Sequence, residues 1–406
     1  MMYLYIDPGT GSMLFAVLMG VVTTLVFAMQ GVMIKLKSKV GTKNVKVDNK
    51  NKENLVIFSD HKRYDNVFIP ILDELENRKI KTSFLTMSSD DPVLSKKYEF
   101  IKSEFIGEGN TAFAKLNLLN AKVVLSTTPG LNVYQWKRSK NVDKYIHIYH
   151  DIAGGLSYRM FGIDFYDVIF TVSELQNENI REIEHKRNIK EKELITVGCT
   201  YIDELIKKYE NTPRVKNDTP IVLIAPSWGA ESLLVKYGDK IIDNVLKTGY
   251  KVVVRPHPQS WISDIDVINN LKNKYGDKIE FNNDNDNFDI LNKSDYMISD
   301  FSSVMLDYAF VFDKPYLYYL TESGRNYDMY DACWLDDPKK HDIAKLNCGI
   351  ELTDDNIDKL KDILRTDSVE IDALKEKRVY YKKLSLAHIK ESTKLVVDNL
   401  KRMIEE

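Results

Sequence analysis

The chain has few cysteines, no surplus of positive charge and no fixed-period repeat. Its three cysteines, Cys199, Cys333 and Cys348, lie far apart and form no C-x-x-C pair, which argues against a disulfide framework and against a cysteine zinc site. Lys and Arg number 57 against 60 Asp and Glu, a formal net charge of −3, so the chain lacks the basic field that holds a nucleic acid backbone. Hydrophobic residues at 44% and aromatic residues at 11% exclude intrinsic disorder for most of the 406 residues, a length typical of two or three domains.

Charge is also absent from residues 8–34, and within this stretch residues 12–34 are almost entirely apolar. About 20 apolar residues at a rise of about 1.5 Å each cross a bilayer core, so the sequence predicts a transmembrane helix over 12–34 behind a short outer segment, 1–11. A cleaved signal peptide and a buried core helix are the alternatives. A signal peptide begins with basic residues, whereas here Asp7 precedes the apolar run.

A basic juxtamembrane linker, 35–52, follows the predicted helix and contains seven lysines. By the positive-inside rule, everything after the helix lies in the cytoplasm. We therefore expect a single-pass protein of the cell membrane whose catalytic part is cytoplasmic.

Short β-branched runs then alternate with polar helical stretches, the pattern of buried parallel strands with crossover helices. The first series of expected strands is 55–59, 82–85, 122–127, 145–150, 168–173 and 194–198. Helices are expected over 68–78 and 174–188, the second capped by Ser173. After Pro213 and Pro220, a second series is 221–227, 251–258, 279–281, 296–300 and 315–320.

This pattern predicts an α/β protein with two doubly wound, Rossmann-like domains behind the transmembrane helix. The expected boundaries are 53–212 for the N-terminal domain and 213–406 for the C-terminal domain, which includes the C-terminal helices. The charged helical tail from residue 368 onward could pack on either domain.

Ligands of such sheets collect at the carboxyl ends of the strands, and polar chemistry follows several of the expected strands. His150 ends a strand before Gly154 and Gly155, where it is either a general base near neutral pH or a structural histidine. His147, three residues earlier, is expected on the opposite side of the strand in a structural role.

The second domain offers candidate phosphate ligands at its strand ends. Ser227 either caps the next helix or faces a ligand. Arg255 and His257, held extended by Pro256 and Pro258, project to the same side and suit a phosphate or diphosphate. For Arg255 the structural alternative requires a carboxylate partner.

A further strand ends at Asp300, and Ser302 and Ser303 open the helix that follows. Their hydroxyls and the free N–H groups of a helix start form an anion site, although a serine pair is also a common cap. Asp307 lies within this helix. The sequence Asp284-Asn285-Asp286 imitates the D-x-D of metal-dependent sugar transferases, but it lies in a polar loop, so no metal site and no cofactor are predicted.

Residues 225–228, 255–258, 299–308 and 314–319 resemble, in order and spacing, the CDP-glycerol glycerophosphotransferase family, the teichoic acid primases and polymerases. The resemblance covers residues 145–319. It implies a GT-B architecture in which the second domain binds most of the donor CDP-glycerol and the reaction occurs in the interdomain cleft.

In that family the proposed base is a histidine of a His-Gly motif after a first-domain strand, and His150 matches this position. Asp151 follows it in place of the glycine, and Pro226-Ser227-Trp228-Gly229 stands where the family has Pro-Thr-Trp-Arg. Asp151 is the next candidate for the base.

The resemblance and the residues together predict a membrane-anchored transferase. It moves glycerol phosphate from CDP-glycerol to a hydroxyl of a lipid-linked, polyprenyl-type acceptor such as an envelope glycan or a teichoic-acid-like chain, and CMP leaves. The predicted catalytic residues are His150 and Asp151, and the predicted donor or phosphate ligands are Ser227, Arg255, His257, Asp300, Ser302, Ser303 and Asp307. For Asp300 and Asp307, orienting His257 or holding a ribose or glycerol hydroxyl is more reasonable than a phosphate contact.

The alternatives are a GT-B glycosyltransferase that uses a nucleotide sugar or another CDP-alcohol, and an inactive membrane scaffold of envelope assembly.

Overall fold

A computed structural model of the chain describes residues 52–152, 156–214, 216–284, 286–320, 328–365 and 369–406. They belong to one compact unit, Lys52–Glu406. The predicted outer segment 1–11, the transmembrane helix 12–34 and all but the last residue of the linker 35–52 lie outside the described residues. Among the helices that are described, none is long and apolar enough to cross a membrane.

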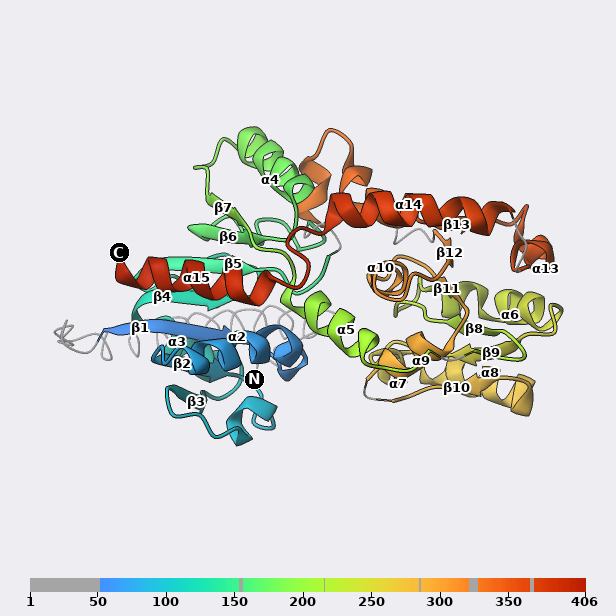
Figure 1. The fold of residues 1–406 in the computed structure, drawn as a ribbon, viewed down its shortest axis with the longest axis horizontal. Helices are drawn as coiled ribbons and strands as arrows, with labels where there is room; N and C mark the ends of the chain where they lie inside the picture. Colours follow the sequence, from blue (N-terminus) through green and yellow to red (C-terminus); the bar gives the residue numbers. More distant parts are fainter. Residues whose placement is uncertain (1–51, 153–155, 215, 285, 321–327, 366–368) are drawn as a thin grey trace, which may run out of the picture. The chain divides into compact units, whose positions relative to one another are not determined.

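The first half of the described chain builds a parallel sheet of seven strands in the order β3-β2-β1-β4-β5-β6-β7 (Figure 1). The strands of this first sheet are β1 (Glu53–Ser59), β2 (Thr82–Thr86), β3 (Ile101–Phe105), β4 (Asn120–Ser126), β5 (Asn141–Ile148), β6 (Val168–Thr171) and β7 (Glu193–Thr196). The helices of this half are η2 (Lys62–Tyr64), α2 (Asp65–Asn77), η3 (Pro92–Ser95), α3 (Gly109–Leu116), α4 (Glu174–Arg187) and α5 (Thr200–Glu210).

The second half builds a parallel sheet of six described strands in the order β10-β9-β8-β11-β12-β13. The strands of this second sheet are β8 (Ile221–Ile224), β9 (Lys251–Val254), β10 (Glu280–Phe281), β11 (Tyr296–Ser299), β12 (Tyr316–Tyr319) and β13 (Gly349–Leu352). Its helices are α6 (Leu233–Leu246), α7 (Ser260–Ser263), α8 (Ile265–Tyr275), η4 (Gly276–Lys278), α9 (Phe288–Lys293), α10 (Val304–Phe310), η5 (Asp331–Trp334), η6 (Pro338–Asp342), α12 (Ile343–Asn347), η7 (Ile357–Lys359), α13 (Leu360–Ile363) and α14 (Val369–Ser385), and the chain ends in α15 (Ser392–Glu405).

The prediction of two parallel α/β sheets is confirmed, since every pair of neighbouring strands in both sheets is parallel. Both sheets reverse direction in strand order once, between β1 and β4 in the first and between β8 and β11 in the second. A doubly wound sheet binds its ligands at such a switch point. The strands β3 and β13 were not predicted.

Local sequence explains where α4 begins and ends. Ser173 has an extended backbone, and its hydroxyl accepts a hydrogen bond from the backbone N–H of Gln176 at the start of the helix. Asn188 adopts a left-handed conformation with φ of 50° immediately after the last helical residue, a common way for a helix to stop. The expected capped helix over 174–188 therefore forms, one residue shorter.

The last helix, α15, packs on the first sheet, although it falls in the range 213–406 predicted for the second domain. Val396, Val397 and Leu400 are buried in one cluster with Leu55 and Ile57 of β1. Figure 1 shows the returning chain leaving α14 and reaching α15 beside β4 and β5.

Asp203 on α5 anchors this return, because its carboxylate accepts hydrogen bonds from the backbone N–H groups of Lys390 and Ser392. Gly198 has a φ of +84°, and a Cβ there would lie 2.5 Å from the carbonyl oxygen of Ala387. The close approach of the two segments therefore requires glycine at this position.

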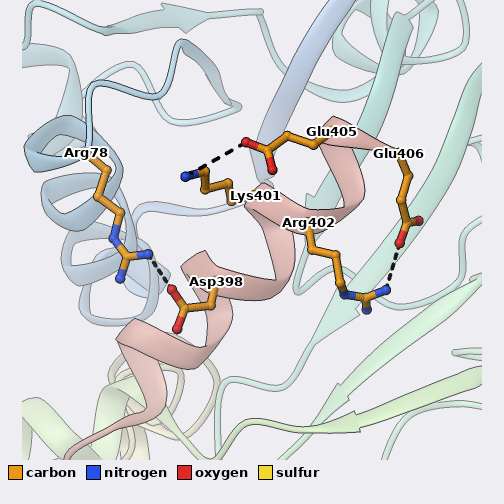
Figure 2. Close-up of a pocket in the computed structure, with 6 residues that line it drawn as sticks. All are labelled: Arg78, Asp398, Lys401, Arg402, Glu405 and Glu406. Carbon is orange, nitrogen blue, oxygen red and sulfur yellow. Dashed lines mark hydrogen bonds and ion pairs between the residues drawn. The ribbon is translucent and has the colours of Figure 1, made fainter.

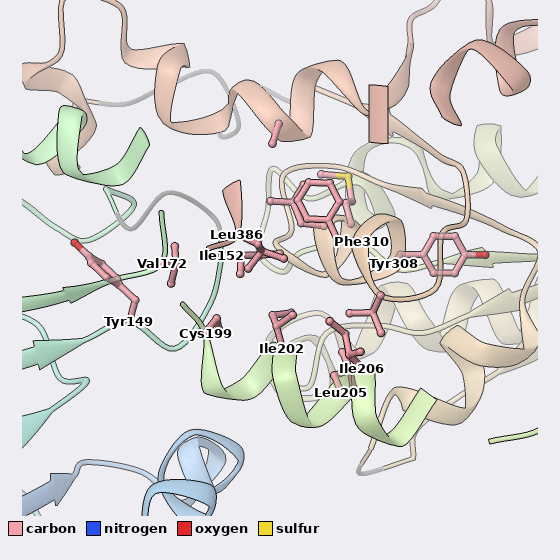
Figure 3. Close-up of a cluster of buried hydrophobic side chains, with 14 of the residues drawn as sticks. Tyr149, Ile152, Val172, Cys199, Ile202, Leu205, Ile206, Tyr308, Phe310 and Leu386 are labelled. Carbon is pink, nitrogen blue, oxygen red and sulfur yellow. The ribbon is translucent and has the colours of Figure 1, made fainter. Parts of the chain in front are cut away.

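One large buried cluster contains side chains from both halves of the described chain. Figure 3 shows Val172 and Cys199, which follow strands of the first sheet, together with Ile202 and Ile206 of α5 and Phe310 of α10. Burial of such apolar side chains stabilises the folded state by about 25 cal/mol per Å². The helices α5 and α10 therefore belong to a common core beside the carboxyl ends of the strands.

Candidate active site

A cavity of about 1100 Å³ lies where residues that follow strands of both sheets come together. Seven of the nine predicted site residues line it: His150, Asp151, Arg255, His257, Ser302, Ser303 and Asp307. The predicted residues Ser227 and Asp300 do not line it. The glycine pair Gly154 and Gly155 lies outside the described residues.

His150 is held by hydroxyl groups on one side of its ring. Its Nδ1 atom lies 3.0 Å from Oγ1 of Thr127, at the end of β4, and 3.4 Å from the hydroxyl oxygen of Tyr158. Its Nε2 atom lies 4.0 Å from Oδ2 of Asp151. The aromatic ring of Tyr64 packs against the imidazole with 4.8 Å between ring centroids.

His147 is structural, as predicted, but it is not remote from His150. The side chain is completely buried, and burial lowers the pKa of His147 to about 3. Its Nε2 atom lies 3.2 Å from the hydroxyl oxygen of Tyr158, the same hydroxyl that approaches His150. The strand β5 ends at Ile148, before His150. The alternation of side chains between the two faces of a strand therefore does not apply to this pair of histidines.

Arg255 is half-buried and points to neutral oxygens. Its guanidinium donates to the side-chain oxygen of Asn282 and, over 2.8 Å, to the backbone oxygen of Asp284. Burial lowers the pKa of Arg255, although the nearby carboxylates of Asp284 and Asp286 oppose this shift. Its hydrogen-bond partners are thus a side-chain amide and a backbone carbonyl. Neither is the carboxylate that the structural alternative requires.

His257 lines the cavity and accepts a backbone hydrogen bond at Nδ1. The backbone N–H of Gln259 donates to its Nδ1 atom over 3.1 Å, so the proton of the neutral ring lies on Nε2. Burial and the charge of Arg63 lower the pKa of His257, while the carboxylate of Asp300 opposes them. A neutral imidazole with Nε2–H is suited to donate to a phosphate oxygen.

Ser302 and Ser303 precede α10 and line the cavity. Ser303 is the N-cap residue, but its side chain makes no capping hydrogen bond. Ser303 therefore does not cap α10 through its side chain, and both serines line the cavity.

Asp300 is completely buried behind the cavity and ties two loops together. Its carboxylate accepts hydrogen bonds from the N–H and the hydroxyl of Ser227, the latter over 2.6 Å, and from the N–H groups of Leu233 and Phe301. The first turn of α6 begins at Leu233, and its side-chain cap is Ser232. Asp300 and Ser227 therefore hold the strand ends of β8 and β11 in place, and neither reaches the cavity.

Asp307 lines the cavity from α10 and is the most perturbed carboxyl group of the site. Burial raises its pKa to about 7, with the hydrogen bond from Tyr201 acting against this shift and the charge of Asp151 adding to it. The Tyr201 hydroxyl donates to Oδ2 of Asp307 over 2.9 Å. This bond joins α5 to α10 at the floor of the cavity.

Lys314, the lysine of the 314–319 motif, bonds to backbone groups of the protein. Its ammonium donates to the carbonyl oxygens of Leu291, Asn292 and Ser294 at the end of α9. Burial lowers the pKa of Lys314 to about 8. The lysine thus fixes the start of β12 to the end of α9.

Several cavity residues were not predicted. Lys62, Arg63 and Tyr64 form the short helix η2 after β1, and Tyr201 and Lys208 come from α5. The residues of η2 follow a strand at the switch point of the first sheet, so the strand-end rule applied to β1 would have found them. No comparable signal marks α5.

The D-x-D sequence is used for loop contacts at its two described positions. Asp284 accepts a hydrogen bond from Asn282, and Asp286 accepts from Lys208 and from the backbone N–H of Phe288. Across the described residues, no group of three or more His, Cys, Asp or Glu side chains is placed to hold a metal ion.

A second cavity, of about 510 Å³, lies at the C-terminal end of α15 (Figure 2). Its charged side chains form pairs with one another: Arg78 with Asp398, Lys401 with Glu405, and Arg402 with Glu406. These groups are already neutralised by their partners, and none follows the carboxyl end of a strand. The cavity is therefore no alternative site for an anionic ligand.

Comparisons with known proteins agree with this geometry. Residues 42–332 match the family described as CDP-Glycerol:Poly(glycerophosphate) glycerophosphotransferase. The minor teichoic acid biosynthesis protein GgaB of Bacillus subtilis (strain 168) is 33% identical over 96 residues, which are 23% of this chain and 10% of that protein. The chain thus matches about a tenth of the length of this curated relative.

Solved structures share the fold. The wall teichoic acid polymerase TagF with CDPG has a TM-score of 0.58 at 14% identity, over 94% of this chain and 98% of that chain. The UDP-GlcNAc 2-epimerase from Neisseria meningitidis bound to UDP-GlcNAc has a TM-score of 0.52 at 14% identity, over 86% and 99% of the two chains. At these identities the likeness concerns the fold alone.

The family match extends over most of the chain and includes the strand ends that build both sides of the cavity. The chain therefore belongs to the CDP-glycerol:poly(glycerophosphate) glycerophosphotransferase family and is a transferase.

Proposed function

We propose that the chain transfers glycerol phosphate from CDP-glycerol to a hydroxyl group of a lipid-linked acceptor of the cell envelope and releases CMP. The observation that carries this proposal is the composition of the 1100 Å³ cavity. It combines a histidine from the first sheet with an arginine, a histidine and two serines from the second. A proton acceptor thus faces a set of donors suited to a diphosphate.

In the proposed reaction the acceptor oxygen attacks the phosphorus nearest glycerol. A new P–O bond forms, the bond between this phosphorus and the CMP oxygen breaks, and the acceptor proton moves to Nε2 of His150. Asp151 lies 4.0 Å from this nitrogen, where its negative charge favours the imidazolium that results.

The donor diphosphate is assigned to Arg255, His257, Ser302 and Ser303. Phosphoryl-type transfer depends on positioning and on stabilisation of the developing charge on oxygen, and these side chains supply one cation and three neutral donors. We assign Asp307, whose carboxyl group is bonded to the Tyr201 hydroxyl, to a hydroxyl of the donor. Asp300 and Ser227 keep the loops that carry these groups in position.

The family name and the TagF structure with CDPG support the choice of donor. The test is to incubate the full chain with radiolabelled CDP-glycerol and lipid extract from the source organism, and to follow CMP release and label in the lipid. UDP-GlcNAc and CDP-ribitol serve as competing donors. Turnover of UDP-GlcNAc in place of CDP-glycerol would contradict the proposal, and no turnover of any donor by folded protein would favour a scaffold.

We also propose that the apolar segment 12–34 anchors the enzyme in the membrane, with its catalytic part in the cytoplasm. The support is its length, its lack of charge and the lysines that follow it. The full chain should resist carbonate extraction from membranes, whereas a chain that begins at residue 35 should be released. Full extraction of the complete chain contradicts the anchor without affecting the proposed reaction.

A further inference from the structure

Two hydroxyl groups face the same ring nitrogen of His150. Thr127 is completely buried at the end of β4, and its Oγ1 atom lies 3.0 Å from Nδ1 of His150. The hydroxyl oxygen of Tyr158 lies 3.4 Å from the same nitrogen. Protein groups therefore contact Nδ1. The other ring nitrogen, Nε2, lies near Asp151, and Asp151 lines the cavity.

Tyr158 also contacts the second histidine. Its hydroxyl oxygen lies 3.2 Å from Nε2 of His147. Burial lowers the pKa of His147 to about 3, so its ring is neutral at physiological pH and carries a single N–H. His147, Tyr158, His150 and Thr127 thus form one continuous network of three hydrogen-bond contacts.

The proton count restricts this network to two arrangements. Tyr158 has one hydroxyl proton for two imidazole nitrogens, and His147 Nε2 is the closer at 3.2 Å against 3.4 Å. Tyr158 either accepts from Nε2 of His147 and donates to Nδ1 of His150, or donates to His147 and presents only lone pairs to His150. In the second arrangement, an N–H on Nδ1 of His150 finds its acceptor in Thr127 Oγ1 at 3.0 Å, a normal hydrogen-bond length.

We propose that Thr127 and Tyr158 are positioning residues that keep the proton of neutral His150 on Nδ1 and leave the lone pair of Nε2 free to take the acceptor proton. This inference rests on the proposed role of His150 as the base. During the reaction the proton of the acceptor hydroxyl moves to Nε2 while the Nδ1–H bond to Thr127 persists. The hydrogen bonds of Nδ1 therefore stay the same before and after the proton transfer.

In the opposite tautomer Nε2 carries the proton and the ring has no lone pair for the acceptor. A histidine held in the wrong tautomer is a poor base even when its position is unchanged. The titratable groups that face His150 are Asp151, Tyr64, Tyr158 and His147. Thr127 is uncharged, so replacing it alters a hydrogen bond and leaves these charges in place.

The tautomer is measured directly by ¹⁵N NMR of the full chain labelled at histidine, with the His150 signals assigned through His150→Gln. We expect a protonated Nδ1 and an unprotonated Nε2 in the wild type and in Thr127→Ser. Thr127→Val should shift the population toward Nε2–H. A wild-type His150 protonated on Nε2 overturns the proposal, and this result does not depend on turnover.

Kinetics supply the second readout. General-base assistance is worth about 10²- to 10⁴-fold in rate and is lost in the wrong tautomer, so Thr127→Val should lower kcat about a hundredfold with the KM for CDP-glycerol unchanged. Thr127→Ser should restore most of it. The acidic limb of the pH–rate profile should move to lower pH in Thr127→Val, because the imidazolium loses the acceptor of its Nδ1–H. Tyr158→Phe should act in the same direction but less, because its contact is longer.

Thr171→Val is the matched control. Thr171 is another completely buried threonine at a strand end, and its hydroxyl donates to Thr196 rather than to a histidine. Equal kcat values in folded Thr127→Val and Thr171→Val contradict the positioning role. If His150→Ala keeps its activity, the proposed base is wrong, but the tautomer assignment is still tested by the NMR measurement.

Discussion

The two sheets place polar side chains at equivalent strand ends but surround them with different chemistry. In the first sheet, Thr127 and His150 interact through neutral hydrogen bonds. The second sheet adds two charged groups: Asp300 is a completely buried carboxylate with four donor groups, and Arg255 is a half-buried cation held by neutral oxygens.

This difference predicts different consequences of substitution. A neutral network fixes the direction and the protonation of a ring, so changes in the first sheet should affect the rate. A buried charge is stable only while its partners are present, and a cation facing a cavity attracts an anion. Changes in the second sheet should therefore affect folding stability or donor affinity.

The largest expected effect tests the first sheet. His150→Ala removes the proposed base, and general-base assistance contributes about 10²- to 10⁴-fold, so kcat should fall at least a hundredfold. Binding of CDP-glycerol, measured by calorimetry, should hardly change, because the donor contacts lie in the second sheet. His185→Ala, on α4, is the control and should retain full turnover. Near-normal turnover of His150→Ala would move the base elsewhere, first to Asp151.

The next effect tests the buried carboxylate of the second sheet. Asp300→Ala leaves the N–H groups of Ser227, Leu233 and Phe301 without their acceptor. Each unsatisfied buried donor costs about 1 to 3 kcal/mol, so the free energy of unfolding in urea should fall by about 3 kcal/mol or more. Asp289→Ala removes an exposed carboxylate from the start of α9 and should change stability by less than about 0.5 kcal/mol. A similar stability of the two variants contradicts the role given to Asp300.

Donor affinity tests the cation of the same sheet. Arg255→Ala and His257→Ala each remove a hydrogen bond to phosphate, which is worth about 1.5 to 3 kcal/mol when charge-assisted. The dissociation constant of CDP-glycerol should rise about ten- to a hundredfold, and that of CMP less if the lost contact is to the phosphate near glycerol. Arg402→Ala, in the paired cluster of Figure 2, should leave both constants unchanged. Unchanged affinity of folded Arg255→Ala removes this residue from the donor site.

The sequence allowed prediction of the central strands and of the edge strands β7 and β10, but not of the edge strands β3 and β13. Residues 55–59 of β1 are all buried, and the first four of them form an unbroken apolar run. In β3 the sequence Ile-Lys-Ser-Glu-Phe has one buried residue, and in β13 only Leu352 is buried. Both lie at a sheet edge, where a strand buries fewer side chains and its sequence pattern is weak.

The strand-end rule identified most of the site, because the end of a strand is a local property. It could not distinguish Asp300 from Arg255, since both follow strands and only their three-dimensional partners separate a loop anchor from a cavity residue. It also missed Tyr201, which reaches the cavity from α5 and contacts a carboxyl group 106 positions away. Contacts of this kind depend on how the helices pack and leave no pattern in the sequence.

The smallest expected effect concerns Asp307, a carboxyl group that joins the two sides of the comparison through Tyr201 of α5. Burial raises the pKa of Asp307 from its usual 3.8 to about 7 in the folded protein, so the folded state binds the proton more tightly. The stability that this proton contributes is complete below pH 4 and is lost as the pH rises through 7. Between pH 6 and pH 8 the loss is about 1 kcal/mol.

Asp307→Asn keeps an oxygen that accepts the Tyr201 hydrogen bond but cannot ionise. The difference in unfolding free energy between wild type and variant should therefore shift by this amount in favour of the variant between the two pH values. A difference that stays constant would show that Asp307 does not change its protonation state between pH 6 and pH 8.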